Sequence, residues 1–128
     1  METIGKIISK AEADKNFGPV VQSIALDTAE VEKLIQASSD YLLFLILESK
    51  LVVLDKNRNA MMGDAKAFDA VTPFHVFSTS KVIELLKSGN APTTTVELRK
   101  DVLSVTNGEY TMEFSTLCPP VCPNKTLE

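Results

Sequence analysis

The amino-acid sequence predicts an α+β fold with one mainly antiparallel sheet, formed by a hairpin and a three-stranded meander, and with helices packed mainly on one face. Three observations indicate this class. An unbroken apolar run, Tyr41–Leu47, is followed at once by a second one, Leu51–Leu54. A segment with helical apolar spacing ends at Gly89. Finally, the hairpin signal Asn107-Gly108 separates two segments rich in β-forming residues.

Two helices and one strand are expected in the first 40 residues. Apolar residues recur at helical spacing over residues 4–11, and Pro19 prevents the helix from extending beyond about two residues after Lys15. Residues 20–26 suggest a strand, although their apolar positions fit neither period well. Asp27 stands three residues before Glu30, which is typical of a capped helix start, and an apolar stripe follows it.

The central hairpin is predicted from the two apolar runs. Tyr41–Leu47 has the continuous apolar character of a strand buried on both faces, and residues 48–50 turn the chain into Leu51–Leu54. Residues 55–59 begin like a calcium loop, but Ala60 replaces the glycine that such a loop needs, so a turn is the better interpretation. A short helix over residues 65–71 and a brief strand over residues 74–77 follow.

The last third is predicted to hold a helix and the meander. Ser78 is expected to cap the helix and Gly89 to end it in a left-handed conformation. Strands are expected over residues 93–99 and 102–106, and residues 109–117 form the returning strand after the Asn107-Gly108 turn. In that strand one alternating set is predicted to face solvent: Glu109, Thr111, Glu113 and Ser115.

The order of these elements resembles that of PAS-type sensor domains and of profilin-like or roadblock-like interaction domains. The resemblance covers roughly residues 28–116 and concerns topology alone, since no residue motif selects one of these families. Fold does not determine function in such cases. The resemblance therefore implies either a small-ligand sensor or an interaction module.

Composition and charge limit the classes of function. Residues 1–117 are predicted to form one domain and residues 118–128 a Cys/Pro-rich tail whose last two residues resemble a tag remnant. A net charge of -4 without a basic block argues against nucleic acid and anionic membrane surfaces as partners. No apolar segment is long enough to span a bilayer and no secretory signal is evident, so a cytoplasmic location is expected.

Ser78 and Lys81 form a Ser-x-x-Lys motif at a predicted helix start. This motif resembles the one in which serine β-lactamases and penicillin-binding proteins place a nucleophile beside a lysine. The partner motifs are absent in the required order and spacing, and the chain is about half the size of those enzymes. Ser78 as a plain helix cap explains the same residue.

Two cysteines and one histidine complete the candidate residues. Cys118 and Cys122 could bind a soft metal, form a disulfide or act as a redox pair, but each role lacks a partner residue, and an extended tail with two incidental thiols is the simpler interpretation. His75 lies among apolar residues, where packing is a more common role than catalysis. The five glycines are far apart, which excludes a nucleotide-binding loop, and no cofactor is predicted.

Three functions follow from these observations. The preferred one is a non-catalytic module for protein interaction or dimerisation, because no catalytic constellation is visible. The first alternative is a PAS-like sensor of a small ligand, with an internal pocket lined by Phe68, Phe74, Phe77 and Met112. The second is a small enzyme or redox protein that uses Cys118, Cys122, His75 or Ser78.

Overall fold

The fold was obtained as a computed structural model. It describes residues 4–37, 40–47, 50–55, 59–62, 74–99, 102–113 and 116–118. Three helices and ten strands are present among these residues. In chain order they are β1 (Lys6–Ser9), α1 (Lys10–Phe17), β2 (Val20–Asp27), α2 (Thr28–Ala37), β3 (Tyr41–Leu47), β4 (Lys50–Asp55), β5 (Ala60–Met62), β6 (Phe74–Ser78), α3 (Thr79–Gly89), β7 (Thr93–Arg99), β8 (Val102–Asn107), β9 (Tyr110–Glu113) and β10 (Thr116–Cys118).

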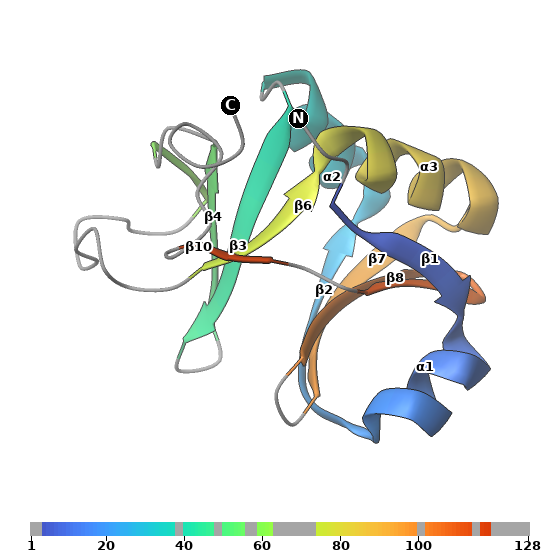
Figure 1. Ribbon diagram of the computed structural model, residues 1–128. Coiled ribbons are helices and arrows are strands. Elements are labelled where there is room, and N and C mark those ends of the chain that lie inside the picture. The colour runs from blue at the N-terminus through green and yellow to red at the C-terminus, as the bar shows by residue number, and fades with distance from the viewer. Residues whose placement is uncertain are drawn as a thin grey trace.

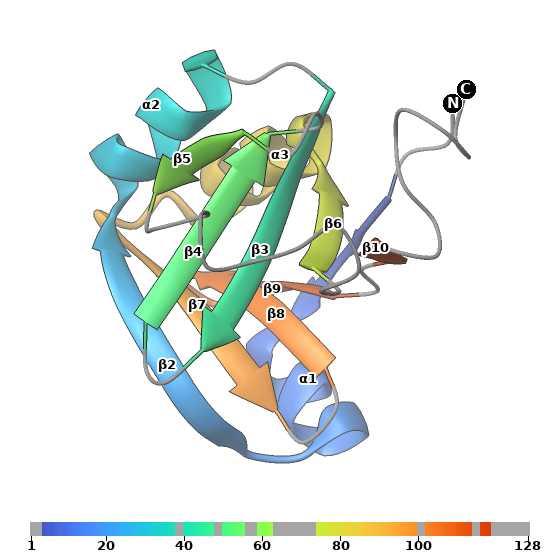
Figure 2. The ribbon, with the colours of Figure 1, turned by 90° about the vertical axis from the view of Figure 1, so that its left-hand side faces the viewer.

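The strands form two antiparallel sheets, so the α+β class is confirmed and the prediction of a single sheet is wrong. The first sheet has the order β1-β9-β8-β7-β2 and the second β10-β6-β3-β4-β5. The predicted meander lies in the first sheet and the predicted hairpin in the second. Figure 2 shows the second sheet in front of the first. The one-sheet order of the PAS, profilin and roadblock architectures is therefore not found.

The main hydrophobic core lies between the two sheets and the helices α2 and α3. Every second residue of β3, starting with Leu42 and Phe44, joins this core, and α3 contributes Val82 and Leu85. Tyr41, Leu43 and Leu45 of β3 belong to a second apolar cluster, in which Leu43 is fully buried. Both faces of β3 are thus buried, as its unbroken apolar sequence predicts.

The three helices do not share one face, contrary to the prediction. Helices α2 and α3 lie together at one end of the sheets, whereas α1 lies apart from them beside the first sheet (Figure 1). Residues from α1 bond to Glu97 and Arg99, which point away from the core because they alternate with the core residue Val96. The first sheet is therefore covered by helices on both faces.

The opening helix, predicted from residue 4 to about two residues after Lys15, starts later than predicted and ends at Phe17 as expected. Ile7 and Ile8 lie in β1, which pairs with β9, and the helix begins only at Lys10. Ser9 caps it: its Oγ accepts a hydrogen bond from the backbone N–H of Glu12 at 3.1 Å. The signal for this start is the Ser9-x-x-Glu12 capping box, which outweighs the helical spacing of the isoleucines. The strand suggested after Pro19 is confirmed as β2.

The returning strand predicted over residues 109–117 is divided between the two sheets. Tyr110–Glu113 pairs with β8, and Thr116–Cys118 pairs with β6. Thr111 and Glu113, expected on a solvated face, are fully buried, whereas Tyr110 is 42% exposed. The alternation of polar and apolar residues is real, but its polar side lies beneath α1 rather than in water.

The boundaries of α3 differ in detail from the predicted caps. Ser78 precedes the helix, but its side chain makes no capping hydrogen bond. The left-handed residue that ends the helix is Asn90, with φ 50°, and not Gly89. The helix predicted over residues 65–71 lies outside the described residues.

Candidate functional site

Ser78 and Lys81 are not arranged as a nucleophile and its base. The Ser78 hydroxyl is buried and accepts a hydrogen bond from the backbone N–H of Ile4 at 2.6 Å. The Lys81 ammonium lies 3.0 Å from the carboxylate of Glu84, one turn further along α3. Each side chain therefore has a structural partner of its own.

His75 and Cys118 lie on neighbouring strands, β6 and β10. Their register sets Leu117 opposite His75 and Cys118 opposite Phe74. His75 is partly buried, and burial lowers the pKa of its imidazole. Cys122 and the rest of the predicted tail lie outside the described residues, so its role stays a prediction. Among the described residues, no group of three His, Cys, Asp or Glu side chains is placed to hold a metal ion.

The aromatic residues predicted to line an internal pocket are divided between two apolar clusters. Phe77 and Met112 are fully buried in the main core, where the Phe77 ring packs edge-on against Phe44 at 6.1 Å between centroids. Phe74 belongs to the other cluster. The three side chains therefore do not surround one common space, and Phe68 lies outside the described residues.

A surface groove between α2 and α3 is the best candidate for a binding site. It has a volume of about 930 Å³. Its walls come from the outer sides of the two helices and from the segment that follows α3. The lining residues are Asp27, Thr28, Ala29, Glu32, Ile35, Gln36, Ile83, Leu86, Lys87, Asn90, Ala91 and Pro92.

The buried side chain of Asn107 holds one end of this groove together. Its amide oxygen accepts a hydrogen bond from the backbone N–H of Ala91 at 2.9 Å, and its amide nitrogen donates to Thr94 Oγ1 at 2.9 Å. Thr28 Oγ1 donates to the carbonyl oxygen of Ala91 at 2.7 Å. These bonds fix the start of α2 against the residues after α3. Asn107 is therefore a positioning residue as well as the residue before a turn.

The turn after Asn107 explains why two glycines are needed here. The loop itself is Gly108-Glu109, and Gly108 alone of the two has a positive φ, at 62°. Glycine at the first loop position is the requirement of a type II′ hairpin. Gly89 packs against this turn, and a Cβ at Gly89 would overlap the carbonyl oxygen of Asn107. Gly89 thus permits a close approach between α3 and the β8–β9 hairpin.

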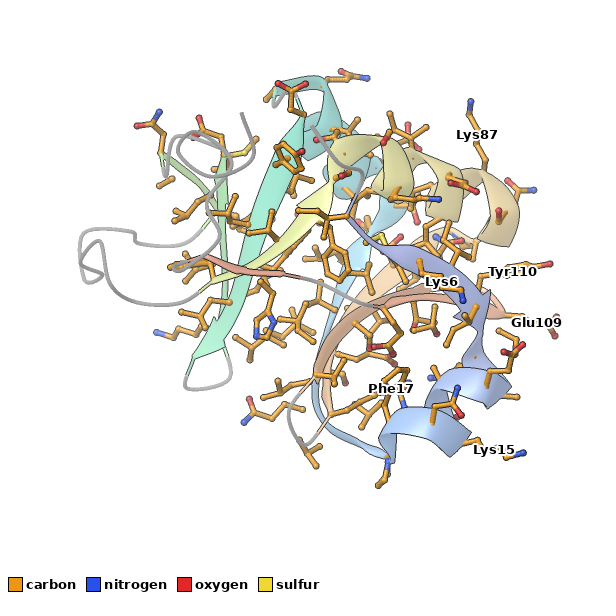
Figure 3. The ribbon with its side chains drawn as sticks, in the orientation of Figure 1. Lys6, Lys15, Phe17, Lys87, Glu109 and Tyr110 are labelled. Atoms are coloured by element: carbon orange, nitrogen blue, oxygen red, sulfur yellow. The ribbon has the colours of Figure 1, made fainter. Side chains whose placement is uncertain are left out.

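The groove combines apolar walls with charges of both signs. Ile83 is 37% exposed, and Ile35 and Leu86 are partly exposed beside it. Glu32 contributes a negative charge from α2, and Lys87 a positive one from α3. Figure 3 shows Lys87 extending outward from α3. An apolar floor with charges at its rim is typical of a surface that binds a partner.

A second unusual feature is a buried group of charges beneath α1. Arg99 is completely buried, and its Nη1 donates to Asp14 Oδ1 and to the carbonyl oxygen of Gly18, each at 2.6 Å. Its Nη2 lies 3.4 Å from Glu97 Oε1, and its Nε lies 3.6 Å from Glu113 Oε1. Asp14 and Gly18 belong to α1 and its end, so Arg99 ties that helix to the sheet.

The carboxylates of this group titrate differently. The hydrogen bond from Arg99 lowers the pKa of Asp14. Burial raises the pKa of Glu113 to about 7, although the nearby guanidinium of Arg99 opposes the rise. The nearby Ser104 hydroxyl also favours the ionised form of Glu113, but in the described part of the chain neither carboxylate oxygen has a hydrogen bond of ordinary geometry. Glu113 is thus the least satisfied ionisable group of the cluster.

The fold and the groove define an α+β protein with two antiparallel sheets and a helical surface groove. No protein family, no curated protein and no solved structure matches this chain. Among the described residues, no helix is both long enough and apolar enough to cross a membrane.

Sequence reasoning missed both the groove and the buried charges. The groove arises from two helices that are far apart in sequence, and no local sequence pattern predicts their contact. The charge cluster has a weak signal, because Glu97 and Arg99 are two residues apart and so share one face of a strand. That pattern by itself fits a solvated face equally well.

Proposed function

We propose that this chain is a non-catalytic protein-interaction module whose α2–α3 groove binds an amphipathic helix of a partner protein. The observation that carries the proposal is the groove itself, where the partly exposed Ile35, Ile83 and Leu86 lie beside charged side chains. Apolar side chains exposed together at a concave surface are a common mark of interaction sites.

The dimensions of the groove favour a short helix as the partner. Helix α2 has ten residues, so at 1.5 Å per residue its wall extends for about 15 Å. A wall of that length matches about three turns of a second helix. Helix-in-groove binding relies on apolar side chains that recur every three or four residues, which fits the row formed by Ile35, Ile83 and Leu86.

The charges of the groove favour a partner with a basic residue on the α2 side. Asp27 and Glu32 both line this side, whereas Lys87 lines the α3 side. A lysine or arginine of the partner near Glu32 would be attracted, and an acidic residue there would be repelled. The two walls therefore set the orientation of the partner as well as its charge.

The experiment is a titration of the protein with two synthetic amphipathic helices of about three turns. They share the same apolar face and differ only in one flanking residue, lysine or glutamate. We expect the lysine peptide to bind more tightly, with NMR shift changes confined to the groove. Glu32→Lys should weaken its binding about tenfold, because attraction becomes repulsion. Ile83→Ser should weaken both peptides.

Glu30→Lys is the matched control for the charge change. Glu30 lies on α2 and is exposed, but it does not line the groove. Glu30→Lys makes the same change in net charge as Glu32→Lys, so we expect it to keep the affinity for the lysine peptide within about twofold of the unaltered chain's. Equal effects of the two variants, or shift changes outside the groove, would contradict the proposal.

The remaining parts of this proposal concern partners and location. We propose a protein partner or self-association, in the cytoplasm, rather than a nucleic acid or a membrane. The mild net charge of -4 supports this choice. No observation on the described residues favours the small-ligand sensor or the small enzyme over the interaction module.

A further inference from the structure

The long edge strand β2 is the second surface with an unused binding capacity. The two sheets have four edge strands, β1, β2, β5 and β10. The strand β2 has eight residues, whereas the other three have four, three and three. Figure 2 shows β2 running along the margin of the first sheet. Long edge strands are templates for pairing unless a feature of the chain blocks them.

The register of the sheet determines which backbone groups of β2 point outward. The backbone N–H of Thr28 donates to the carbonyl oxygen of Pro92 at 2.8 Å, which continues the β2–β7 ladder. Bonding alternates along an antiparallel pair, so Leu26 and Ile24 also point towards β7. The N–H and C=O groups of Ser23 and Ala25 and the N–H of Asp27 therefore point away from the sheet, and no described strand pairs with them; the C=O of Asp27, just before α2, begins the hydrogen bonding of that helix.

The side chains of β2 offer little protection against pairing. Between Val20 and Asp27 there is no proline and no lysine, and Asp27 is the only charged residue. Ser23, Ala25 and Asp27 are exposed. By contrast, β1 carries the exposed Lys6. A register shift at Val21 disturbs only the first part of β2, so its second part remains regular.

We propose that two copies of this chain pair antiparallel through β2, with the two-fold axis at Ala25. In this register Ala25 faces Ala25 of the second copy, and Ser23 faces Asp27 of the second copy. On the core side Ile24 faces Leu26 of the second copy. The two-fold axis repeats this contact between half-buried apolar side chains, so it forms twice in the interface. The first sheets of the two copies then join into one continuous sheet.

The charge and apolar patterns select this register over its neighbours. Pairing centred on Asp27 would set the two Asp27 carboxylates opposite each other, which is unfavourable. Pairing centred on Ile24 would set Leu26 opposite Gln22, and the apolar contact would be lost. Only the Ala25-centred register pairs polar with polar and apolar with apolar along the regular part of the strand. A second copy is therefore a better occupant than an arbitrary extended peptide.

The first experiment is sedimentation equilibrium of the full chain over a range of concentrations. We expect a mass that rises from 14.0 kDa towards twice that value. Ala25→Pro removes the N–H at the centre of the interface while sparing the bonds to β7, because that N–H points outward. This variant should raise the dimer dissociation constant at least about tenfold. Ala25→Thr is the matched control, since it keeps the N–H and favours a strand.

The second experiment locates the interface by amide hydrogen exchange of the unaltered chain. In the proposed dimer the amides of Ser23, Ala25 and Asp27 become protected as the concentration rises. Those of Ile24 and Leu26 are protected at every concentration, because they bond within the sheet. This measurement holds even if Ala25→Pro fails to fold.

Three outcomes would overturn the dimer. They are a monomer at every concentration, a dimer that Ala25→Pro leaves intact, and a dimer in which the amides of Ser23, Ala25 and Asp27 stay unprotected. Asp27 belongs to both surfaces, but the peptide titration is read at Glu32 and Ile83, which line the groove and lie outside β2, so the two tests remain distinguishable.

Discussion

The buried carboxyl of Glu113 makes a prediction about stability and pH. In the folded chain, burial raises the pKa of Glu113 from its ordinary 4.5 to about 7. In the unfolded chain the same group ionises near 4.5. Between these two values the folded state holds a proton that the unfolded state has released, so stability falls as pH rises. Above about pH 7 no further loss from this group is expected.

The size of the effect follows from the shift in pKa. A rise from 4.5 to about 7 corresponds to about 3 kcal/mol of lost stability once Glu113 is ionised in both states. The variant Glu113→Gln removes the titration and keeps the shape of the side chain. Its stability relative to the unaltered chain should therefore improve by about 2 to 3 kcal/mol between about pH 5 and about pH 7.5.

The assay is urea unfolding of both proteins across this pH range, and the quantity compared is the difference between them. The comparison is necessary because His75 changes the free energy of unfolding in the same pH range with the opposite sign. Burial lowers the pKa of His75, so its contribution to stability grows as pH rises towards 6.5. His75 is common to both proteins and cancels. Glu109→Gln is the control, because Glu109 is exposed on the same hairpin. A constant difference between Glu113→Gln and the unaltered chain would refute the account of this cluster.

Three further predictions concern single residues. Gly89→Ala should lower the free energy of unfolding by about 2 kcal/mol or more, because the new Cβ overlaps the Asn107 carbonyl oxygen. In Gly18→Ala the new Cβ meets no neighbouring atom, but residue 18 has φ 83°, so this variant should cost only about 1 kcal/mol. Urea unfolding midpoints compare the two variants. Ser78→Ala should cost about 1 to 3 kcal/mol by leaving the buried Ile4 N–H without its acceptor, while NMR shifts of the first turn of α3 stay helical; a frayed first turn would mean that Ser78 is a cap after all. Asp14→Asn should speed amide hydrogen exchange in α1, because Arg99 loses its charged partner on that helix. Glu12→Gln on the same helix should leave the exchange rates unchanged. Equal exchange rates in the two variants would contradict the role of Arg99.

The parts of the fold that the sequence predicted well rest on strong local patterns. The run Tyr41–Leu47 contains seven consecutive apolar residues, a pattern that indicates a strand buried on both faces. The helix Thr79–Gly89 carries Val82, Leu85 and Leu86 at helical spacing; Val82 and Leu85 pack into the core, and Leu86 packs partly against it. In both places the local preference and the tertiary environment agree, so the prediction is confirmed.

The errors arise where a local pattern has two physical meanings. Alternation in Tyr110–Glu113 marks a strand with one polar face, but it does not say whether water or a polar interior covers that face. Arg99 and the helix α1 supply the polar interior here. The division into two sheets depends on which strands meet, and pairings such as β1 with β9 join residues about a hundred positions apart.

The candidate site was even less accessible from the sequence. The conspicuous motifs at Ser78 and Lys81 have structural roles that are visible only from their partners, Ile4 and Glu84. The groove depends on Asn107, which the sequence marks only as a turn residue. Its side chain reaches the start of α2 and the residues after α3 because Gly89 lets the hairpin approach.

A charge exchange across the α2–α3 groove tests the proposed interaction most directly. The lysine and glutamate peptides are each titrated against the unaltered chain and against Glu32→Lys. We predict tight binding for the two combinations of opposite charge and weak binding for the two of like charge. The glutamate peptide should therefore bind Glu32→Lys more tightly than it binds the unaltered chain. If all four dissociation constants agree within about twofold, the groove does not recognise its partner in the way proposed here.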